Sequence, residues 1–218
     1  MPEVNLLAKL PTTKRNIHAR AGAKTAEIVA TARDYGRAYF DGPREYGYGG
    51  YRYDGRWIPV AEEIVRHFDL HPGNRVLDVG CAKGFLVKDL MKVCPGLEAF
   101  GIDVSQYALM HCEPEVVGRL HLGSAVALPF PADSFQAVVS INTIHNLQRL
   151  DAIRAVGEIE RLAPGRGFIQ VDSYRTPEQR EVFLQWVLTA QFHDYPAGWL
   201  ELFAEAGYTG DHYWTIVE

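Results

Sequence analysis

Two aspartates occupy positions where carboxylates commonly bind polar ligands. Asp78 begins a glycine-containing turn that runs to Gly84, and Asp103 closes the next hydrophobic run. The two oxygens of a carboxylate can accept hydrogen bonds from both hydroxyls of a ribose, and a carboxylate beside a glycine turn can face an ammonium group. Asp78 alone is equally well explained as a turn-forming aspartate. With Asp103 at the matching place in the following strand, the pair predicts a site for a nucleoside that carries a positive charge.

The glycine turn departs from two other nucleotide-binding motifs. A dinucleotide fingerprint needs glycine at positions 80, 82 and 85, where this chain has Gly80, Ala82 and Phe85. A phosphate-binding P-loop ends in Gly-Lys followed by Ser or Thr, whereas the order here is Lys83-Gly84. A P-loop is therefore excluded, and a nicotinamide cofactor is kept only as a weaker alternative.

From residue 75 the chain shows strand patterns alternating with helix patterns. Short β-branched runs that end at glycine or aspartate predict strands, and apolar residues at helical spacing predict helices. Strands are expected at 75–80, 97–104, 119–123, 135–141 and 167–172, with helices at 59–70, 85–93 and 149–163. Helical crossovers require a parallel sheet covered on both faces, so the predicted fold is α/β, of the open doubly wound type. Ligands of such sheets lie beyond the carboxyl ends of the strands.

Further elements flank this core. We expect an alanine-rich helical segment at 21–40, helices at 177–192 and 197–206, and a last strand at 212–217 on an antiparallel edge. The expected division is an N-terminal arm, helix and Tyr/Gly-rich lid at 1–58, then a ligand-binding domain at 59–218 with an insertion at about 175–198. The first 24 residues are basic, and we expect them to form a solvated arm; they carry Lys9, Lys14, Arg15, Arg20 and Lys24 against Glu3 alone.

Five segments, in this order, resemble the class I S-adenosylmethionine-dependent methyltransferases. They are Val76–Gly84, similar to the glycine-rich first motif; Gly101–Val104, similar to the ribose-binding second strand; Leu128–Phe135, before strand four; Ile141–Leu147, after strand four; and Arg161–Phe168, before strand five. The resemblance covers about residues 75–172 and implies a Rossmann-like methyltransferase fold with S-adenosyl-L-methionine as cofactor. The cofactor-binding residues that it implies are Asp78, Gly80, Cys81, Gly84, Asp103, Val104, Ser124, Ala125 and Asn142.

Two residues depart from the pattern of that family. Ala82 replaces the usual middle glycine of the turn, a change of one methyl group. Ser124 stands where the family often has an aspartate that meets the adenine amino group. A serine hydroxyl can accept the same hydrogen bond, but less strongly than a carboxylate.

Methyl transfer from a sulfonium is an in-line displacement in which the protein chiefly aligns the acceptor and excludes water. A general base is therefore optional. His145, just beyond the fourth strand, is our candidate base, with a structural or positioning role as the alternative. Asn142 and Asn146 either orient the substrate or bond the backbone after the strand.

The segment from Tyr46 to Trp57 combines tyrosines with glycines, and we interpret it as a lid over the cofactor and acceptor. Its aromatic rings can stabilise a sulfonium, and its arginines can pair with a carboxylate. Tyr51 is assigned to catalysis, and Tyr46 and Arg56 to cofactor binding. The alternative is an aromatic patch that packs the N-terminal helices onto the sheet.

Composition narrows the classes of partner. The chain has 218 residues, with 22 basic against 27 acidic side chains and a formal charge of -5, so no overall positive field attracts nucleic acid or an anionic membrane. No run approaches the roughly 20 apolar residues of a membrane span. The three cysteines lack the spacing of a zinc site, and we expect no metal. A cytoplasmic protein with a small-molecule partner is expected.

These observations predict an S-adenosylmethionine-dependent methyltransferase that acts on oxygen or nitrogen of a small polar metabolite. Two alternatives stay open at this point. One is a nicotinamide-dependent reductase, and the other is a non-catalytic regulator that binds S-adenosylmethionine.

Overall fold

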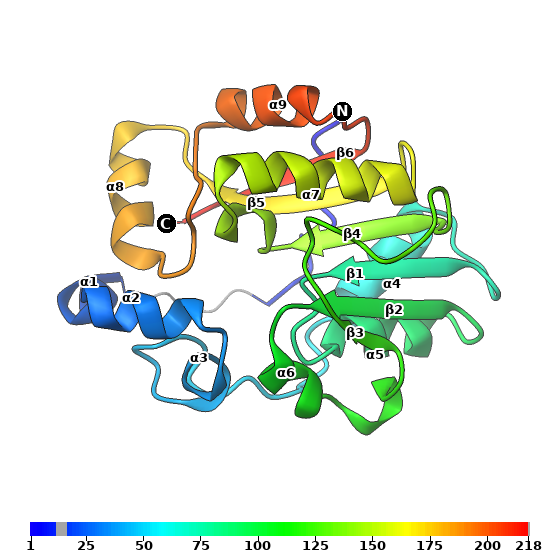
Figure 1. Ribbon diagram of the computed structural model, residues 1–218, viewed down its shortest axis with the longest axis horizontal. Coiled ribbons are helices and arrows are strands. Elements are labelled where there is room, and N and C mark those ends of the chain that lie inside the picture. Colours follow the sequence, from blue (N-terminus) through cyan, green and yellow to red (C-terminus); the bar gives the residue numbers. More distant parts are fainter. Residues whose placement is uncertain (12–16, 218) are drawn as a thin grey trace.

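The computed structural model describes residues 1–11 and 17–217. Within these residues, one parallel sheet is built from β1 (Arg75–Val79), β2 (Glu98–Asp103), β3 (Leu120–Leu122), β4 (Ala137–Ile141), β5 (Gly167–Ser173) and β6 (Asp211–Ile216). The strand order is β3-β2-β1-β4-β5-β6 (Figure 1). Because β1 has β2 on one side and β4 on the other, the order reverses there. The carboxyl end of β1 is thus the topological switch point, where ligands of open α/β sheets bind.

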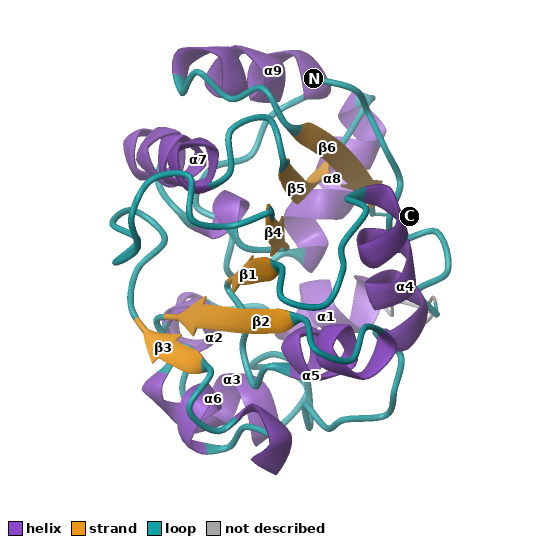
Figure 2. Ribbon diagram, turned by 90° about the vertical axis from the view of Figure 1, so that its right-hand side faces the viewer, coloured by secondary structure: helices purple, strands orange, loops and turns teal. Residues whose placement is uncertain are grey.

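Helices cover both faces of the sheet, as predicted (Figure 2). Alternate strand residues point to opposite faces, so Leu77 packs with the side of α7 (Arg149–Leu162) and α9 (Pro196–Glu205), whereas Val76 packs with α4 (Ile58–His67) and α5 (Phe85–Val93). All five residues of β4 and all seven of β5 are buried. Burial on both faces is typical of central strands of a parallel sheet, and the polar residues of β4 and β5, such as Ser140 and Gln170, are buried with the apolar ones.

The last strand corrects a prediction. β6 pairs with β5 in parallel, in a register from Phe168↔Asp211 to Ser173↔Ile216, whereas an antiparallel edge was expected. After β5 the chain passes through α8 (Pro177–Trp186) and α9, which return it to the end of the sheet at which β5 begins. A chain that returns to this end enters the next strand in the same direction as β5, so the two strands are parallel.

The N-terminal arm is also different from the expectation. Glu3 forms a parallel bridge with His212 at the outer edge of β6, and Leu6 is only 2% exposed. Val4, Leu7 and Leu10 pack against the same core, so the apolar residues of this segment hold it on the protein rather than in solvent. Lys14 and Arg15 lie outside the described residues.

The expected helix at 21–40 is broken into three: α1 (Ile17–Ala23), α2 (Ala26–Arg33) and α3 (Arg37–Asp41). Thr25 caps α2 by accepting a hydrogen bond from the Ile28 amide at 3.2 Å, and Tyr35 takes a φ of +48° between α2 and α3. A threonine cap and a left-handed residue both interrupt a continuous helix.

The three N-terminal helices lie beyond the carboxyl ends of the strands, with α1 beside α8 and α3 near α6 (Figure 1). α1 packs against α8, and Lys24 Nζ donates to the carbonyl oxygens of Leu184 and Val187, each at 2.6 Å. Lysine at this place satisfies carbonyls that the end of α8 leaves unpaired. We call residues 17–57 together with 177–192 the cover. Three short helices remain: α6 (Gln106–Met110) and η1 (Pro114–Val116) lie between β2 and β3 in the chain, and η2 (Ile144–Asn146) follows β4.

None of the helices in the described part of the chain has the length and apolar character needed to cross a bilayer.

Candidate cofactor and acceptor site

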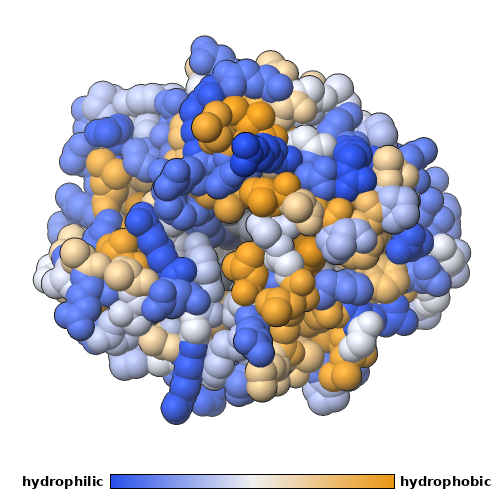
Figure 3. Space-filling model, viewed as in Figure 1, coloured by the Kyte–Doolittle hydropathy of each residue, from blue (hydrophilic) through white to orange (hydrophobic). Residues whose placement is uncertain are grey.

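A pocket lies between the carboxyl ends of β1, β2 and β4 and the cover. The surface of the molecule is hollowed near its centre in the corresponding view (Figure 3). Polar residues at the strand ends form one wall, and aromatic rings of the cover form the other. The lining includes Asp78, Gly80, Cys81, Asp103, Val104, Ser124, Ala125, Asn142, Thr143 and, from the cover, Tyr35, Tyr39, Phe40, Tyr48, Tyr51 and Trp57. We call this the first pocket.

The turn after β1 has no room for a side chain at position 80, where it borders the pocket. Gly80 has a φ of +85°, and a Cβ built on it would lie 1.9 Å from Thr143 Oγ1. Ala82 also takes a left-handed conformation, with a φ of +49°. The conformation at position 82 explains why glycine would be easier there, since L-residues pay a steric cost in this region.

Asp103 is held by the two turns that flank it. Its Oδ2 accepts a hydrogen bond from the Ala82 amide and its Oδ1 one from the Ser105 amide, both at 2.8 Å. Burial raises the pKa of this carboxyl, while the hydrogen bonds from Ser105 and Ala82 oppose the rise. Each carboxylate oxygen has a second lone pair. The carboxylate is therefore fixed in position at the end of β2 and keeps acceptor capacity for a ligand in the pocket.

Asp78 is buried, with 5% of its surface exposed, and no described residue donates a hydrogen bond to it or pairs with its charge. Burial raises its pKa to about 8, and the nearby charge of Asp103 adds to the effect. An unpaired carboxylate in a buried site is costly unless a cation reaches it. The floor of the first pocket thus presents a site for a positively charged group beside a fixed acceptor.

The structure brings most of the sequence-predicted residues together. Those that line the first pocket are Asp78, Gly80, Cys81, Asp103, Val104, Ser124, Ala125, Asn142 and Tyr51. Gly84, expected to bind cofactor, does not line it. Gly84 is the residue that precedes α5 and has a φ of +75°. A Cβ at this position would meet the side chains of Val116 and Leu120, so the glycine allows the start of the helix to pack closely against them.

Two residues of the expected lid are also placed differently. Tyr46 is not among the residues that line either pocket described here. The Arg56 guanidinium is engaged by Asp54, two residues earlier, with an N–O distance of 2.6 Å, and it borders a second pocket instead. Tyr53 Oη donates to Asp89 Oδ1 of α5 at 2.6 Å, which is a packing contact. The tyrosine-rich segment thus combines the two alternatives, with Tyr48 and Tyr51 over the pocket and Tyr53 holding the segment in place.

Sequence reasoning missed the aromatic residues Tyr35, Tyr39 and Phe40, which line the first pocket; Tyr35 lies between α2 and α3, and the other two belong to α3. Tyr35 and Tyr39 make a T-shaped contact with ring centroids 5.4 Å apart. Their spacing of four residues within a helical pattern was the available signal, but this spacing equally indicates a core face.

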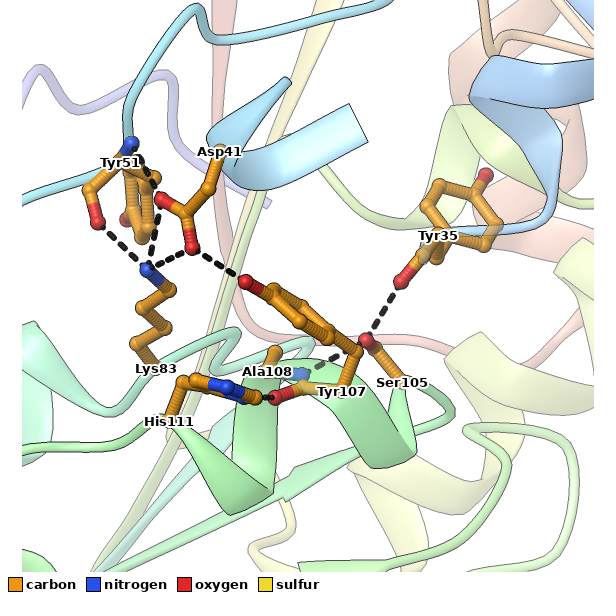
Figure 4. Close-up of polar contacts among 8 residues, drawn as sticks. All are labelled: Tyr35, Asp41, Tyr51, Lys83, Ser105, Tyr107, Ala108 and His111. Carbon is orange, nitrogen blue, oxygen red and sulfur yellow. Dashed lines mark hydrogen bonds and ion pairs between the residues drawn. The ribbon is translucent and has the colours of Figure 1, made fainter. Parts of the chain in front are cut away.

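A polar network fastens the cover to the two turns that hold the pocket (Figure 4). Lys83, in the turn after β1, is 6% exposed and donates to both carboxylate oxygens of Asp41, at 2.7 and 2.9 Å, and to the Tyr51 carbonyl at 2.9 Å. Tyr107 of α6 donates to Asp41 Oδ2 at 2.8 Å. Ser105 donates to the Tyr35 carbonyl at 2.6 Å. The cover is thus held at the same turns that position Asp78 and Asp103.

A second pocket adjoins the first. The two share Tyr39, Tyr48, Tyr51, Trp57 and Asn142, so they meet along one aromatic and amide boundary. The second pocket is also lined by Arg20, Arg44, Arg52, Arg56, His145, Asp172 and Trp186. A ligand in one pocket therefore lies next to a ligand in the other.

His145 lines the second pocket, but its hydrogen bonding argues against the predicted role as a base. The Asp172 amide donates to His145 Nδ1 at 3.1 Å, which uses the lone pair of that nitrogen. The proton of the neutral ring then sits on Nε2, which becomes a donor. Burial lowers the pKa of His145, which keeps the ring neutral. This arrangement favours the alternative of a positioning residue that donates a hydrogen bond.

The described residues contain no group of three or more His, Cys, Asp or Glu side chains arranged to hold a metal ion.

Comparisons with known proteins agree with this geometry. The family described as "Methyltransferase domain" matches residues 77–171. The chain is 31% identical over 128 residues to demethylmenaquinone methyltransferase of Symbiobacterium thermophilum, covering 55% of this chain and 50% of that protein. It is 26% identical over 173 residues to (+)-O-methylkolavelool synthase of Herpetosiphon aurantiacus, covering 69% of this chain and 58% of that protein.

A solved structure shows the same fold. Phosphoethanolamine N-methyltransferase 2 of Haemonchus contortus, in complex with phosphomonomethylethanolamine and S-adenosylhomocysteine, superposes with a TM-score of 0.57 at 21% identity, over 81% of this chain and 44% of that one. The chain spans about half the length of the curated relatives it matches. The turn after β1 and the aspartate that ends β2 both lie within residues 77–171, the part of the chain that matches the methyltransferase domain family, and the solved structure shares the fold.

Proposed function

We propose that this protein binds S-adenosyl-L-methionine in the first pocket and transfers its methyl group to a small molecule held in the second. The observation that carries the proposal is the buried carboxylate of Asp78, which no described residue pairs, beside the fixed carboxylate of Asp103. The cofactor has a cationic ammonium group at one end and ribose hydroxyls at the other, which are the groups that these two carboxylates are suited to bind.

Other residues of the first pocket fit the same cofactor. Gly80 has no side chain, and the place of its Cβ is taken by Thr143, so both residues border the pocket where a ligand can approach the backbone of the turn. Val104 is 55% exposed although it is apolar, and it borders the pocket next to Asp103. An apolar surface at this place suits the face of a purine ring, with the Ser124 hydroxyl as a hydrogen-bond partner.

When bound, the cofactor supplies a methyl group on a positively charged sulfur. A nucleophile can attack this methyl carbon directly, with the sulfur as the leaving group. The part of this chain is then to align the acceptor and keep water out. The rings of Tyr39, Tyr48 and Tyr51 lie at the boundary of the two pockets, where their faces can stabilise a cation. Orientation of two bound reactants contributes as much as roughly 7–11 kcal/mol to a reaction of this kind.

For the acceptor we propose oxygen or nitrogen of a small polar molecule in the cytoplasm. The second pocket supports a polar acceptor, because Asn142, His145 and Asp172 border it beside the aromatic rings. Asp172 is 8% exposed, and its carboxylate is an acceptor that could take a proton from a hydroxyl or ammonium group. The names of the relatives include a quinone substrate, an O-methyl product and an N-methyltransferase, so they do not favour one acceptor atom.

The test is a calorimetric titration of the protein with S-adenosylhomocysteine and, separately, with NADH. We expect the first to bind with a micromolar dissociation constant and the second not to bind. Asp78→Asn should abolish the affinity for S-adenosylhomocysteine, whereas Asp69→Asn is the matched control, because the Asp69 side chain is 89% exposed. Absence of binding by the unmodified protein, or equal binding by the two variants, would refute the proposal.

A further inference from the structure

Two arginines of the cover lie side by side at the second pocket. Arg20 donates to the Gly47 carbonyl oxygen at 3.2 Å, and Arg44 donates to the same oxygen. Both guanidinium groups also lie over the ring of Trp186, at 4.7 and 5.7 Å from its centroid. One carbonyl and one aromatic face therefore fix two cations together, although they come from α1 and from the loop after α3.

No described carboxylate lies within ion-pair distance of either guanidinium. This distinguishes them from Arg56, at the same pocket, which is paired with Asp54 at 2.6 Å. Each guanidinium has five N–H donors, and the carbonyl of Gly47 occupies one donor of each. The pair thus retains most of its hydrogen-bonding capacity, and neither guanidinium forms an ion pair with a described carboxylate.

Two neighbouring positive charges oppose one another. Partial burial lowers the pKa of Arg20, and the charge of Arg44 lowers it further. The other cations that contact this part of the cover, Lys24 and Arg33, donate to carbonyl oxygens and add no negative charge. An anion between the two guanidinium groups would turn this repulsion into attraction, and guanidinium forks match carboxylate and phosphate oxygens in geometry.

We propose that the methyl acceptor of this protein is itself an anion, with a carboxylate or phosphate group that Arg20 and Arg44 bind at the second pocket. This inference rests on the proposed function and names the chemical class of its substrate. The anionic group lies at the arginines, and the atom that receives the methyl group lies toward Asn142, where the two pockets meet.

The arginine pair is assigned to the acceptor rather than to the cofactor because of its position. Arg20 and Arg44 line the second pocket and not the first, whereas Asp78 and Asp103 line the first and not the second. The boundary between them is aromatic. A cofactor held by the two aspartates therefore has its charged amino acid end at Asp78, on the far side of the boundary from the arginines.

The test measures anion binding with and without S-adenosylhomocysteine. Benzoate and phenyl phosphate serve as anionic probes, and benzamide serves as the neutral probe of the same size. We expect at least one anion to bind the protein at least tenfold more tightly than benzamide, and Arg44→Gln or Arg20→Gln to weaken that binding roughly tenfold or more. Arg154→Gln is the matched control, because Arg154 is an exposed residue of α7 paired with Asp151. Comparison of benzoate with phenyl phosphate shows which anionic group is preferred.

Three results would overturn the inference. The first is equal affinity for the anions and benzamide, which includes no binding of any probe. The second is anion binding that Arg44→Gln and Arg20→Gln leave unchanged while the thermal melting curves show folded protein. The third is a tenfold loss of affinity for S-adenosylhomocysteine in these variants, which would assign the pair to the cofactor. Failure of S-adenosylhomocysteine to bind the unmodified protein would instead refute the proposed function, and the probe titrations without it report on the arginines separately.

Discussion

Asp78→Asn should make the protein more stable at alkaline pH while removing its affinity for the cofactor. The reason is that Asp78 has a pKa of about 8 in the folded protein, against a usual value of 3.8. Between these two values the folded state holds a proton that the unfolded state has lost. The free energy of unfolding therefore falls as the pH rises through this window, and the full destabilisation is present above pH 8.

The size of the effect follows from the shift. A rise of about four pKa units corresponds to about 6 kcal/mol at most. Water that enters the open pocket lowers this value, so we expect the Asp78→Asn variant to gain roughly 2–4 kcal/mol over the unmodified protein at pH 8.5. At pH 4 both side chains are largely neutral, and the two proteins should be similar.

The assay is urea denaturation of both proteins, without cofactor, at pH 4, 6 and 8.5, followed by a titration with S-adenosylhomocysteine. In the unmodified protein the ammonium of the ligand should also drive the release of a proton from Asp78 at pH 7. Calorimetry in buffers of different ionisation enthalpy measures the number of protons released when the ligand binds. A stability difference between variant and parent that stays constant from pH 4 to 8.5 would refute the reasoning.

Three further predictions concern the turn and the cover. Gly80→Ala should abolish binding of S-adenosylhomocysteine in calorimetry, because the new methyl group would meet Thr143 Oγ1 at 1.9 Å and the φ is +85°; retained binding would show that the turn can move. Ala82→Gly should leave the free energy of unfolding in urea within roughly 1 kcal/mol of the parent or raise it, because relief at a φ of +49° offsets the flexibility of glycine; a larger loss would contradict this. Asp41→Asn should lower the free energy of unfolding by roughly 1–3 kcal/mol and weaken cofactor binding, because the buried Lys83 loses its carboxylate partner. The double variant Asp41→Asn with Lys83→Met should recover part of the stability. If it recovers none, the lost ion pair is not the cause.

The sheet was predictable because its signals are local. Buried strands such as Arg75–Val79 are short β-branched runs that end at a glycine turn, and the following helix begins at the expected residue. The direction of β6 was not predictable in this way. A strand pattern is the same in either direction, and only the path through α8 and α9 decides it.

The floor of the first pocket was also within reach of the sequence. In a parallel sheet the carboxyl ends of neighbouring strands meet at one edge, so Asp78 and Asp103 had to come close together once their strands were recognised. Gly84 was assigned to the cofactor because glycine in a turn does not show whether it makes room for a ligand or for a helix. The closeness of Val116 and Leu120 to Gly84 indicates that this glycine makes room for the packing of the helix.

By itself the sequence determined the layered fold, the turn and the two carboxylates, because hydrophobic period, glycine position and strand ends are properties of neighbouring residues. Only the tertiary structure decided which distant residues contact the turn, the cover and the pockets. Lys83 meets Asp41 across 42 residues, Arg20 meets Arg44 through the carbonyl of Gly47, and the Asp172 amide reaches the ring of His145. Contacts of this kind depend on how separate elements pack, and no local pattern in the chain encodes which partner a charged or aromatic side chain will find.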